Sequence, residues 1–197
     1  MVGLRLAATA KGAMVAPMGQ IIIVAGPPGA GKTTVSNRLA KRTDADLSLC
    51  VRTDDTYGYL RKGAVPPWLP ESRYQNAVLM HAMATSAAVC ACGGYEVYVD
   101  GVVGPWLLEP WLNAAKSQEL ALHYVVLFPD EPTTVARATA RTEFGAMTDA
   151  GVTANMWRQF VATPPPQGCV LDTTGRTVDE TVNAVRVGLA AGRFRVA

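Results

Sequence analysis

Two stretches of the sequence carry residue types that suit phosphate chemistry. The first is GPPGAGKT, residues 26–33, which is rich in glycine and ends in a lysine and a threonine. The second is RTDDTYGYLRKG, residues 52–63, where the carboxylates of Asp54 and Asp55 are adjacent in the chain. Neighbouring like charges repel each other, so stability gives no reason for this pair. We therefore expect the pair to have a chemical role.

The glycine-rich stretch matches the pattern G-x-x-x-x-G-K-[ST] in full. Its glycines let backbone N–H groups turn inward around a phosphate, and the following helix directs its positive N-terminus at the same place. Lys32 can reach the β- and γ-phosphates, and the Thr33 hydroxyl can ligate Mg²⁺. We therefore predict a nucleoside triphosphate site formed by Gly26, Pro27, Pro28, Gly29, Ala30, Gly31, Lys32, Thr33 and Thr34.

Composition restricts the other classes of function. The 197 residues are 49% hydrophobic and 17% charged, which fits one soluble globular domain. A formal net charge of +2 is too small to indicate binding to nucleic acid or to an acidic membrane surface. The four cysteines contain no C-x-x-C pair, so we expect reduced thiols in a cytoplasmic protein. We expect either a monomer or a homodimer. Residues 1–19 show weak periodicity and are expected to form a flexible leader before a single domain, 20–197.

Strand-like and helix-like segments alternate along that domain. Short apolar or β-branched runs predict strands within 20–26, 46–52, 96–101, 120–128 and 168–173. Helices are expected from Lys32, from a capping box at 72–75 up to 93, near 106–117, over 131–143 behind Asp130, near 153–162, and from a capping box at 177–180. Such alternation favours a parallel sheet with helices on both faces. Ligands then bind at the carboxyl ends of the strands, where Asp54, Asp55 and Asp100 all lie.

A small kinase needs fewer motifs and a shorter chain than other classes of nucleotide-binding protein. The chain has no N-K-x-D guanine-binding motif of a GTPase, and it is short for an AAA-type motor. A kinase needs a triphosphate site, a magnesium carboxylate, an acceptor site and arginines on a mobile segment. Asp100, which ends the apolar run VYVD, is the expected Mg²⁺ ligand beside Thr33, although a DG turn at a strand end is also common.

The expected arginines are Arg137 and Arg141, which are four residues apart on the helix predicted over 131–143. Facing the cleft, they would neutralise charge on the transferred phosphoryl group. Facing outward, they would instead pair with the acidic residues Asp130, Glu131 or Glu143.

Taken as an ordered set, five motifs resemble those of the small P-loop kinases: GPPGAGKT, TDD, VDGVVGPW, VARATAR and VLDTTG. The resemblance covers about residues 20–190, and the layout is most similar to zeta-toxin-like and chloramphenicol-phosphotransferase-like AAA-family ATPases. It implies a three-layer α/β/α P-loop NTPase fold, with a five-stranded parallel sheet in the order 2-3-1-4-5 and a small helical lid near 130–150. It also implies an adenine contact in the loop 173–176, which contains Arg176. Unlike adenylate kinases, the chain has no arginine in the segment 102–105.

The acid pair bears on the phosphoryl acceptor. Two carboxylates beside an anionic acceptor would cost of order 1 to 4 kcal/mol per close pair, whereas a hydroxyl acceptor benefits from a carboxylate base. In related kinases the acid that directly follows the strand is catalytic, which corresponds to Asp54. Neighbouring side chains in an extended segment point to opposite sides, so Asp55 is expected to cap the next helix through the N–H of Tyr57 or Gly58. Capping remains an alternative for Asp54 as well.

Substrate-binding candidates flank this acid. Besides Asp54 they are Tyr57, Tyr59, Arg61 and Trp106, and core packing is an equally good expectation for any single aromatic residue. The favoured hypothesis is an ATP- and Mg²⁺-dependent kinase that phosphorylates a hydroxyl of a small molecule, such as a metabolite, sugar or antibiotic. Its catalytic residues would be Lys32, Asp54 and Arg137 or Arg141. The alternatives are a nucleoside or nucleotide kinase that holds its acceptor with Arg61 and Arg73, and a non-catalytic ATP-binding switch.

Overall fold

A parallel five-stranded sheet forms the centre of the molecule, as the computed structural model shows for residues 18–142 and 146–197. The strand order is β2-β3-β1-β4-β5, which confirms the expected order. The strands are β1 (Gln20–Ala25), β2 (Ser48–Arg52), β3 (Glu96–Asp100), β4 (Ala121–Leu127) and β5 (Val170–Leu171). The flexible leader expected over residues 1–19 cannot be compared with the structure, because residues 1–17 lie outside the described residues.

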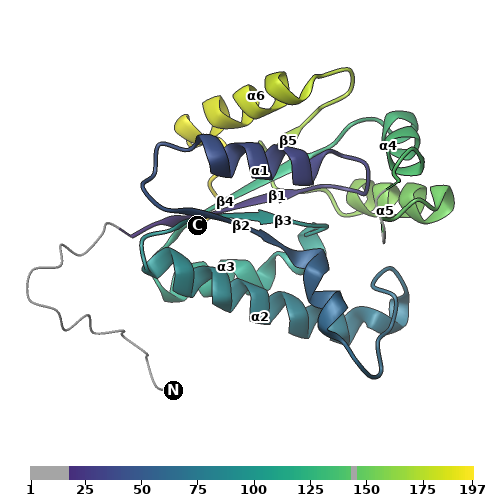
Figure 1. Ribbon diagram of the computed structural model, residues 1–197, viewed down its shortest axis with the longest axis horizontal. Coiled ribbons are helices and arrows are strands. Elements are labelled where there is room, and N and C mark those ends of the chain that lie inside the picture. Colours follow the sequence, from purple (N-terminus) through teal and green to yellow (C-terminus); the bar gives the residue numbers. More distant parts are fainter. Residues whose placement is uncertain (1–17, 143–145) are drawn as a thin grey trace, which may run out of the picture.

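Helices cover both faces of this sheet (Figure 1). The helices α1 (Lys32–Arg42) and α6 (Val178–Ala190) lie on one face, and α2 (Arg73–Cys92) and α3 (Glu109–Ser117) lie on the other. Alternate residues of β1 serve the two layers, as the period of a strand requires. Ile22 packs in the core beneath α1 and α6, while Ile21 packs in the core beneath α2 and α3. Burial on both faces explains why β1 is an uninterrupted apolar run.

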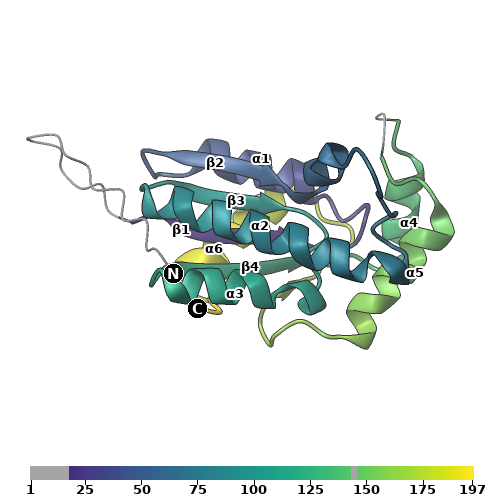
Figure 2. The ribbon, with the colours of Figure 1, turned by 90° about the horizontal axis from the view of Figure 1, so that it is seen from below.

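Two further helices, α4 (Glu131–Thr139) and α5 (Ala150–Ala162), pack against each other at the carboxyl edge of the sheet (Figure 1). The Asp130 side chain caps α4 by accepting from the Thr133 N–H, as expected. The ring of Trp157 on α5 stacks on Phe128 with centroids 5.1 Å apart, and its Nε1 donates to the Pro129 carbonyl at 2.9 Å. These contacts fix α5 beside the end of β4. In Figure 2, α5 lies beyond the amino-terminal end of α2.

Two local expectations are wrong. The helix expected over 131–143 ends at Thr139, so Arg141 lies beyond it and does not share a helical face with Arg137; Glu143 is outside the described residues. The expected capping box at 72–75 does not form either, although the one at 177–180 does. Ser72 Oγ instead donates to the Pro67 and Leu69 carbonyls. Competition from these loop carbonyls removes the hydroxyl from the helix terminus.

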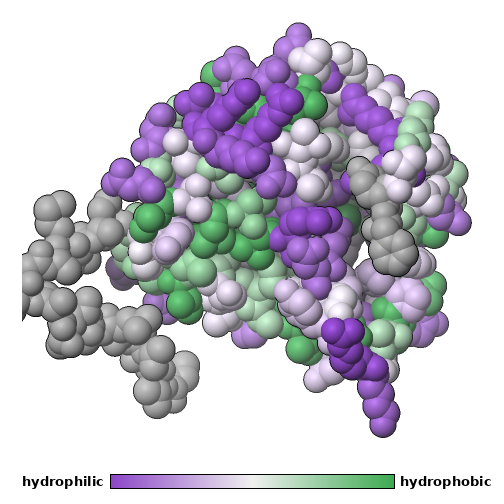
Figure 3. Space-filling model, viewed as in Figure 1, coloured by the Kyte–Doolittle hydropathy of each residue, from purple (hydrophilic) through white to green (hydrophobic). Residues whose placement is uncertain are grey.

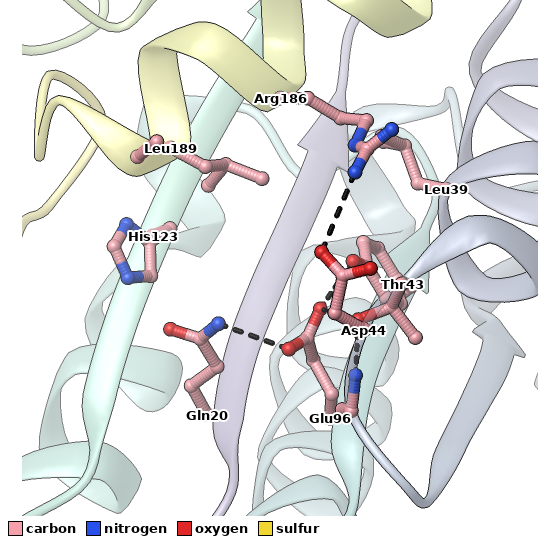
Figure 4. Close-up of a pocket in the computed structure, with 11 residues that line it drawn as sticks. Gln20, Leu39, Thr43, Asp44, Glu96, His123, Arg186 and Leu189 are labelled. Carbon is pink, nitrogen blue, oxygen red and sulfur yellow. Dashed lines mark hydrogen bonds and ion pairs between the residues drawn. The ribbon is translucent and has the colours of Figure 1, made fainter.

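A small cavity of about 290 Å³ lies at the amino edge of the sheet, where Gln20 and Glu96 begin β1 and β3 (Figure 4). The Glu96 carboxylate accepts from Gln20 Nε2 at 3.1 Å, from Thr43 Oγ1 at 3.0 Å and from the Tyr98 hydroxyl. Its charge is therefore satisfied within the protein, which indicates a structural polar cluster.

On the side of the molecule seen in Figure 3, hydrophilic residues gather over α1 and α6. Arg38 and Arg42 of α1 both pair with Asp179 of α6, at 2.7 and 3.1 Å. None of the described helices has the length and apolar character needed to cross a membrane.

Candidate active site

The glycine-rich loop joins β1 to α1 and is packed closely against α4. Gly29 has a φ of +83°, and a Cβ at this position would lie 2.3 Å from the Thr134 carbonyl oxygen of α4. Only glycine meets both conditions, because a side chain would be strained and would also displace the helix. The loop and α4 therefore form one unit, so the position of α4 follows that of the phosphate-binding backbone.

A Gly29→Ala substitution should lower stability by at least about 2 kcal/mol, because it combines a left-handed backbone with a backbone clash. Gly63→Ala is the matched control, since Gly63 has a φ of +71° but open space around its Cβ position. The control should cost only about 1 kcal/mol. Urea unfolding of the two variants measures both values. Equal losses would show that α4 does not depend on close contact with the loop.

Lys32 is buried at the start of α1, with 8% of its surface exposed. Its Nζ donates to the Pro27 carbonyl within the loop at 2.9 Å. Burial lowers the pKa of Lys32, while the nearby carboxylates of Asp100 and Asp54 oppose this shift and Arg141 adds to it. A cation, two carboxylates and an arginine from separate segments thus meet at the end of the glycine-rich loop.

Asp100 ends β3, next to α1, and is 3% exposed. Burial raises its pKa, while Lys32 and a hydrogen bond from Thr33 lower it. Arg52 Nε lies 3.7 Å from Asp100 Oδ2. A buried carboxylate beside a hydroxyl supplies the hard oxygen atoms that Mg²⁺ prefers. The described part of the chain holds no cluster of three His, Cys, Asp or Glu residues, but Mg²⁺ commonly takes its remaining oxygens from phosphates and water. The residues present therefore fit this metal.

The two acids of the second stretch lie in a 3₁₀ helix, η1 (Thr53–Tyr59), and not in an extended segment. With about three residues per turn, neighbouring side chains do not point to opposite sides, and Asp54 and Asp55 both line the same cavity. The expected cap is wrong: Arg52 occupies the N-cap position and η1 has no side-chain cap. The Asp55 carboxylate instead lies 3.6 Å from the Arg52 guanidinium.

Close packing of two strand ends places Asp54 near Asp100. A Cβ on Gly101 would lie 1.8 Å from the Thr53 Oγ1, so the loop after β3 touches the start of η1. Thr53 is buried there, and Asp54 contributes to the pKa shifts of Lys32 and Asp100. The sheet thus brings the acid of the second stretch to the phosphate site.

Only some of the aromatic and basic residues predicted to bind the substrate line the cavity that contains Asp54. Tyr57 lines the cavity and donates to Asn76 Oδ1 at 3.1 Å; burial first, and Asp54 second, raise its pKa to about 12. Trp106 also lines the cavity. Tyr59 is 74% exposed, and neither Tyr59 nor Arg61 lines the cavity.

Of the two arginines predicted to be catalytic, one lines the cavity and the other does not. Arg141 lines the cavity near Lys32. Arg137 is absent from the cavity lining and lies near Asp130, where it adds to the hydrogen bonds from Thr133 that lower the pKa of Asp130. Arg158, a further arginine on α5, pairs with Glu131 at 2.7 Å.

The loop that contains Arg176 is joined to the start of α4. The Thr174 hydroxyl accepts from the Asp130 N–H at 2.8 Å, and the Arg176 N–H donates to the Thr173 carbonyl at 3.3 Å. The loop is therefore held at the same edge of the sheet as the glycine-rich loop, on the β5 side, and Arg176 lies outside the cavity that contains Asp54.

A cavity of about 1460 Å³ connects Lys32, the acid pair and Arg141. It extends from Lys32, Thr33 and Thr34 past η1 to a proline-rich loop, the first turns of α2, and α5. Sequence reasoning missed Arg52, Asn76 and Gln159 in its lining. Arg52 had a usable signal, because it precedes the acid pair at a strand end. Asn76 and Gln159 had none, because only the packing of α2 and α5 brings them there.

Solved structures with this arrangement include several kinases, at low sequence identity. APS kinase of Mycobacterium tuberculosis, solved in complex with AMPPNP and APS, matches with a TM-score of 0.64 and 14% identity over 88% of this chain and 99% of that one. A gluconokinase of Sinorhizobium meliloti matches at 0.61 and 17%, over 88% and 93%. The tunicamycin resistance protein of Deinococcus radiodurans matches at 0.60 and 16%, over 91% and 99%.

The amino-acid sequence of this chain identifies the protein family to which it belongs. No curated protein matches the chain. The family model described as AAA domain (AAA_33) matches residues 21–166, which contain the glycine-rich loop, the acid pair, Asp100 and α5. The chain therefore belongs to this AAA domain family, and its fold is that of the small P-loop kinases.

Proposed function

We propose that this protein is a kinase that transfers the γ-phosphoryl group of ATP to a hydroxyl of a small molecule. The observation that carries the proposal is the position of Asp54. Its carboxylate lies in the electrostatic range of Lys32 and Asp100 and lines the same cavity as Thr33. A carboxylate in this place suits a hydroxyl acceptor, which must lose a proton, better than an acceptor that is already anionic.

In the proposed reaction, the backbone of the glycine-rich loop and Lys32 hold the β- and γ-phosphates. Asp54 accepts the proton of the acceptor hydroxyl while the hydroxyl oxygen of the acceptor bonds to the γ-phosphorus. The bond between the γ-phosphorus and the β,γ-bridging oxygen breaks, and ADP leaves with that oxygen. Lys32 and Arg141 stabilise the charge that develops on the transferred group. Thr33 and Asp100 would hold Mg²⁺, which when bound neutralises phosphate charge. Arg52 keeps Asp100 and Asp55 in place through the two ion pairs described above.

The number of arginines at the acceptor end of the cavity distinguishes an alcohol kinase from a nucleotide kinase. That alternative needs Arg61 and Arg73 at the acceptor, and only Arg73 lines the cavity. A phosphate-bearing acceptor would also face both Asp54 and Asp55. Charge therefore favours an acceptor whose reacting group is an alcohol.

The full chain incubated with ATP, Mg²⁺ and a panel of alcohols and nucleoside monophosphates tests the proposal. Mass spectrometry should show at least one alcohol heavier by one phosphoryl group, and chelation of the metal should abolish this product. Phosphorylation of nucleoside monophosphates alone would contradict the hydroxyl acceptor. Hydrolysis of ATP that no acceptor changes would contradict a kinase and favour the switch.

A further inference from the structure

The acceptor end of the cavity is largely apolar. Beyond Asp54 its walls carry two indole rings and several aliphatic or thioether side chains: Trp68, Leu69, Met80, Trp106, Leu107 and Met156. Trp106 remains 42% exposed and Trp68 38% exposed, although both border a concave surface. Large aromatic side chains left accessible in a cavity are characteristic of ligand sites.

Trp106 is held rigidly in this position. Its ring packs edge-on against Phe160 of α5, with centroids 5.2 Å apart at 62°. It also lies over Gly104 so closely that a Cβ there would be 2.4 Å from the ring. The exposed part of the ring is therefore a fixed surface. Binding of a ligand to it costs little side-chain entropy, because the Trp106 side chain is already held in place.

The loop that bears Trp68 is likewise fastened to α2. The Gln75 side chain forms hydrogen bonds to both the N–H and the carbonyl of Val65, at 2.9 and 2.8 Å. Asn76 Nδ2 donates to the Pro67 carbonyl at 2.8 Å, and Ser72 Oγ donates to the same carbonyl at 2.9 Å. The proline-rich segment is thus a preorganised wall of the cavity.

Cationic groups are sparse at this end. Arg52 is engaged by Asp55 and Asp100, and Arg141 lies near Lys32 at the phosphate end. Among the described residues of the cavity, Arg73 is the cation left on the acceptor side, and the polar side chains of Asn76 and Gln159 also line the cavity. A sugar acid or a small polyol would need several polar partners here, because each of its buried hydroxyl groups must be satisfied.

We propose that the acceptor is a hydroxyl compound with a flat apolar body, such as an aromatic ring, which contacts Trp106 and Trp68 while its hydroxyl reaches Asp54. This inference rests on the proposed kinase function and specifies its substrate class. Cavity size agrees with it, since about 1460 Å³ exceeds the roughly 300–1,000 Å³ of a typical single-ligand site. A nucleotide and an acceptor of considerable size can therefore occupy it together.

The test uses 3-phenyl-1,2-propanediol, which is glycerol with one terminal hydroxyl replaced by a phenyl ring. Glycerol is its control, and gluconate represents the sugar acids. Binding is measured by calorimetry on the full chain with AMPPNP and Mg²⁺, and transfer by mass spectrometry with ATP. The aromatic diol should bind at least about tenfold more tightly than glycerol, since burying its ring contributes more than 1.4 kcal/mol.

Trp106→Ala and Trp68→Ala should each weaken binding of the aromatic diol at least about fivefold. Tyr74→Ala is the matched control, because Tyr74 is 82% exposed on α2 and absent from the cavity lining, and it should change nothing. Thermal unfolding and AMPPNP binding establish that each variant is folded. The two tryptophans are on separate segments, so one variant remains informative if the other fails to fold.

Equal affinity for the aromatic diol and for glycerol, or affinity for the aromatic diol that neither substitution changes, would overturn the inference. Phosphorylation of gluconate or glycerol without binding of the aromatic diol would overturn it and leave the proposed kinase function intact. Tryptophan-dependent binding of the aromatic diol, with no transfer to any alcohol, would support the inferred ligand class and contradict the kinase function.

Discussion

Asp54→Asn should reduce phosphoryl transfer by roughly 10²–10⁴-fold, the usual contribution of a general base, while ATP still binds. The amide keeps the size of the carboxylate but cannot accept the proton of an acceptor hydroxyl. Lys32 and the glycine-rich backbone, which hold the phosphates in the proposed reaction, are unchanged by this substitution. Transfer is measured by mass spectrometry with an alcohol identified from the panel, and affinity for AMPPNP by calorimetry.

Asp55→Asn is a stringent control for this experiment. Both side chains line the cavity, so a simple loss of negative charge affects them alike. Asp55 is 3.6 Å from Arg52 in a half-exposed ion pair, which contributes little to stability. We expect its loss to reduce transfer by less than about tenfold, corresponding to less than about 1.4 kcal/mol. Similar losses for the two variants would show that Asp54 has no special role as a base.

Lys32→Met should reduce transfer by at least roughly 10²–10³-fold, the effect of removing one group that stabilises developing charge. Its effect on stability should be small. Because burial lowers the pKa of Lys32, the protonated form is disfavoured in the folded state and costs folding free energy at neutral pH. This cost is relieved only as the pH rises through the lowered pKa.

Methionine fills a similar space and removes the desolvation cost of the buried charge. This gain offsets the loss of the charged hydrogen bond to Pro27, worth about 1.5–3 kcal/mol, and of the attraction to the buried Asp100 carboxylate. We therefore expect an unfolding midpoint within about 4 °C of the parent protein. Lys41→Met is the matched control on the exposed side of the same helix, and should change neither transfer nor stability. Both are measured by calorimetric melting and by the transfer assay. A large fall in the midpoint for Lys32→Met would mean that the lysine stabilises the fold.

Local sequence determined the phosphate site and the frame that holds it. The spacing of Gly26, Gly31, Lys32 and Thr33 specifies a loop geometry that few other functions need, and the β-branched run before it specifies a buried strand. Alternation of strands and helices predicts the parallel sheet, and the strand ends predict that Asp54 and Asp100 meet. These features follow from periodicity and from short-range chemistry, which a sequence displays directly.

Tertiary structure alone decided which residues line the cavity in front of Asp54. Tyr57, Tyr59 and Arg61 are close in sequence, but the 3₁₀ turn directs Tyr57 into the cavity, while Tyr59 is mostly exposed. The same turn places Asp55 beside Asp54, where an extended chain would have separated them.

The opposite wall of the cavity comes from distant segments, with Gln159 on α5 and Asn76 on α2. Their places depend on long-range packing, such as that of Trp157 on Phe128, which no local pattern encodes. The sequence thus determined that a phosphate is bound beside two acids, and only packing between remote elements decided the shape and polarity of the space in front of them.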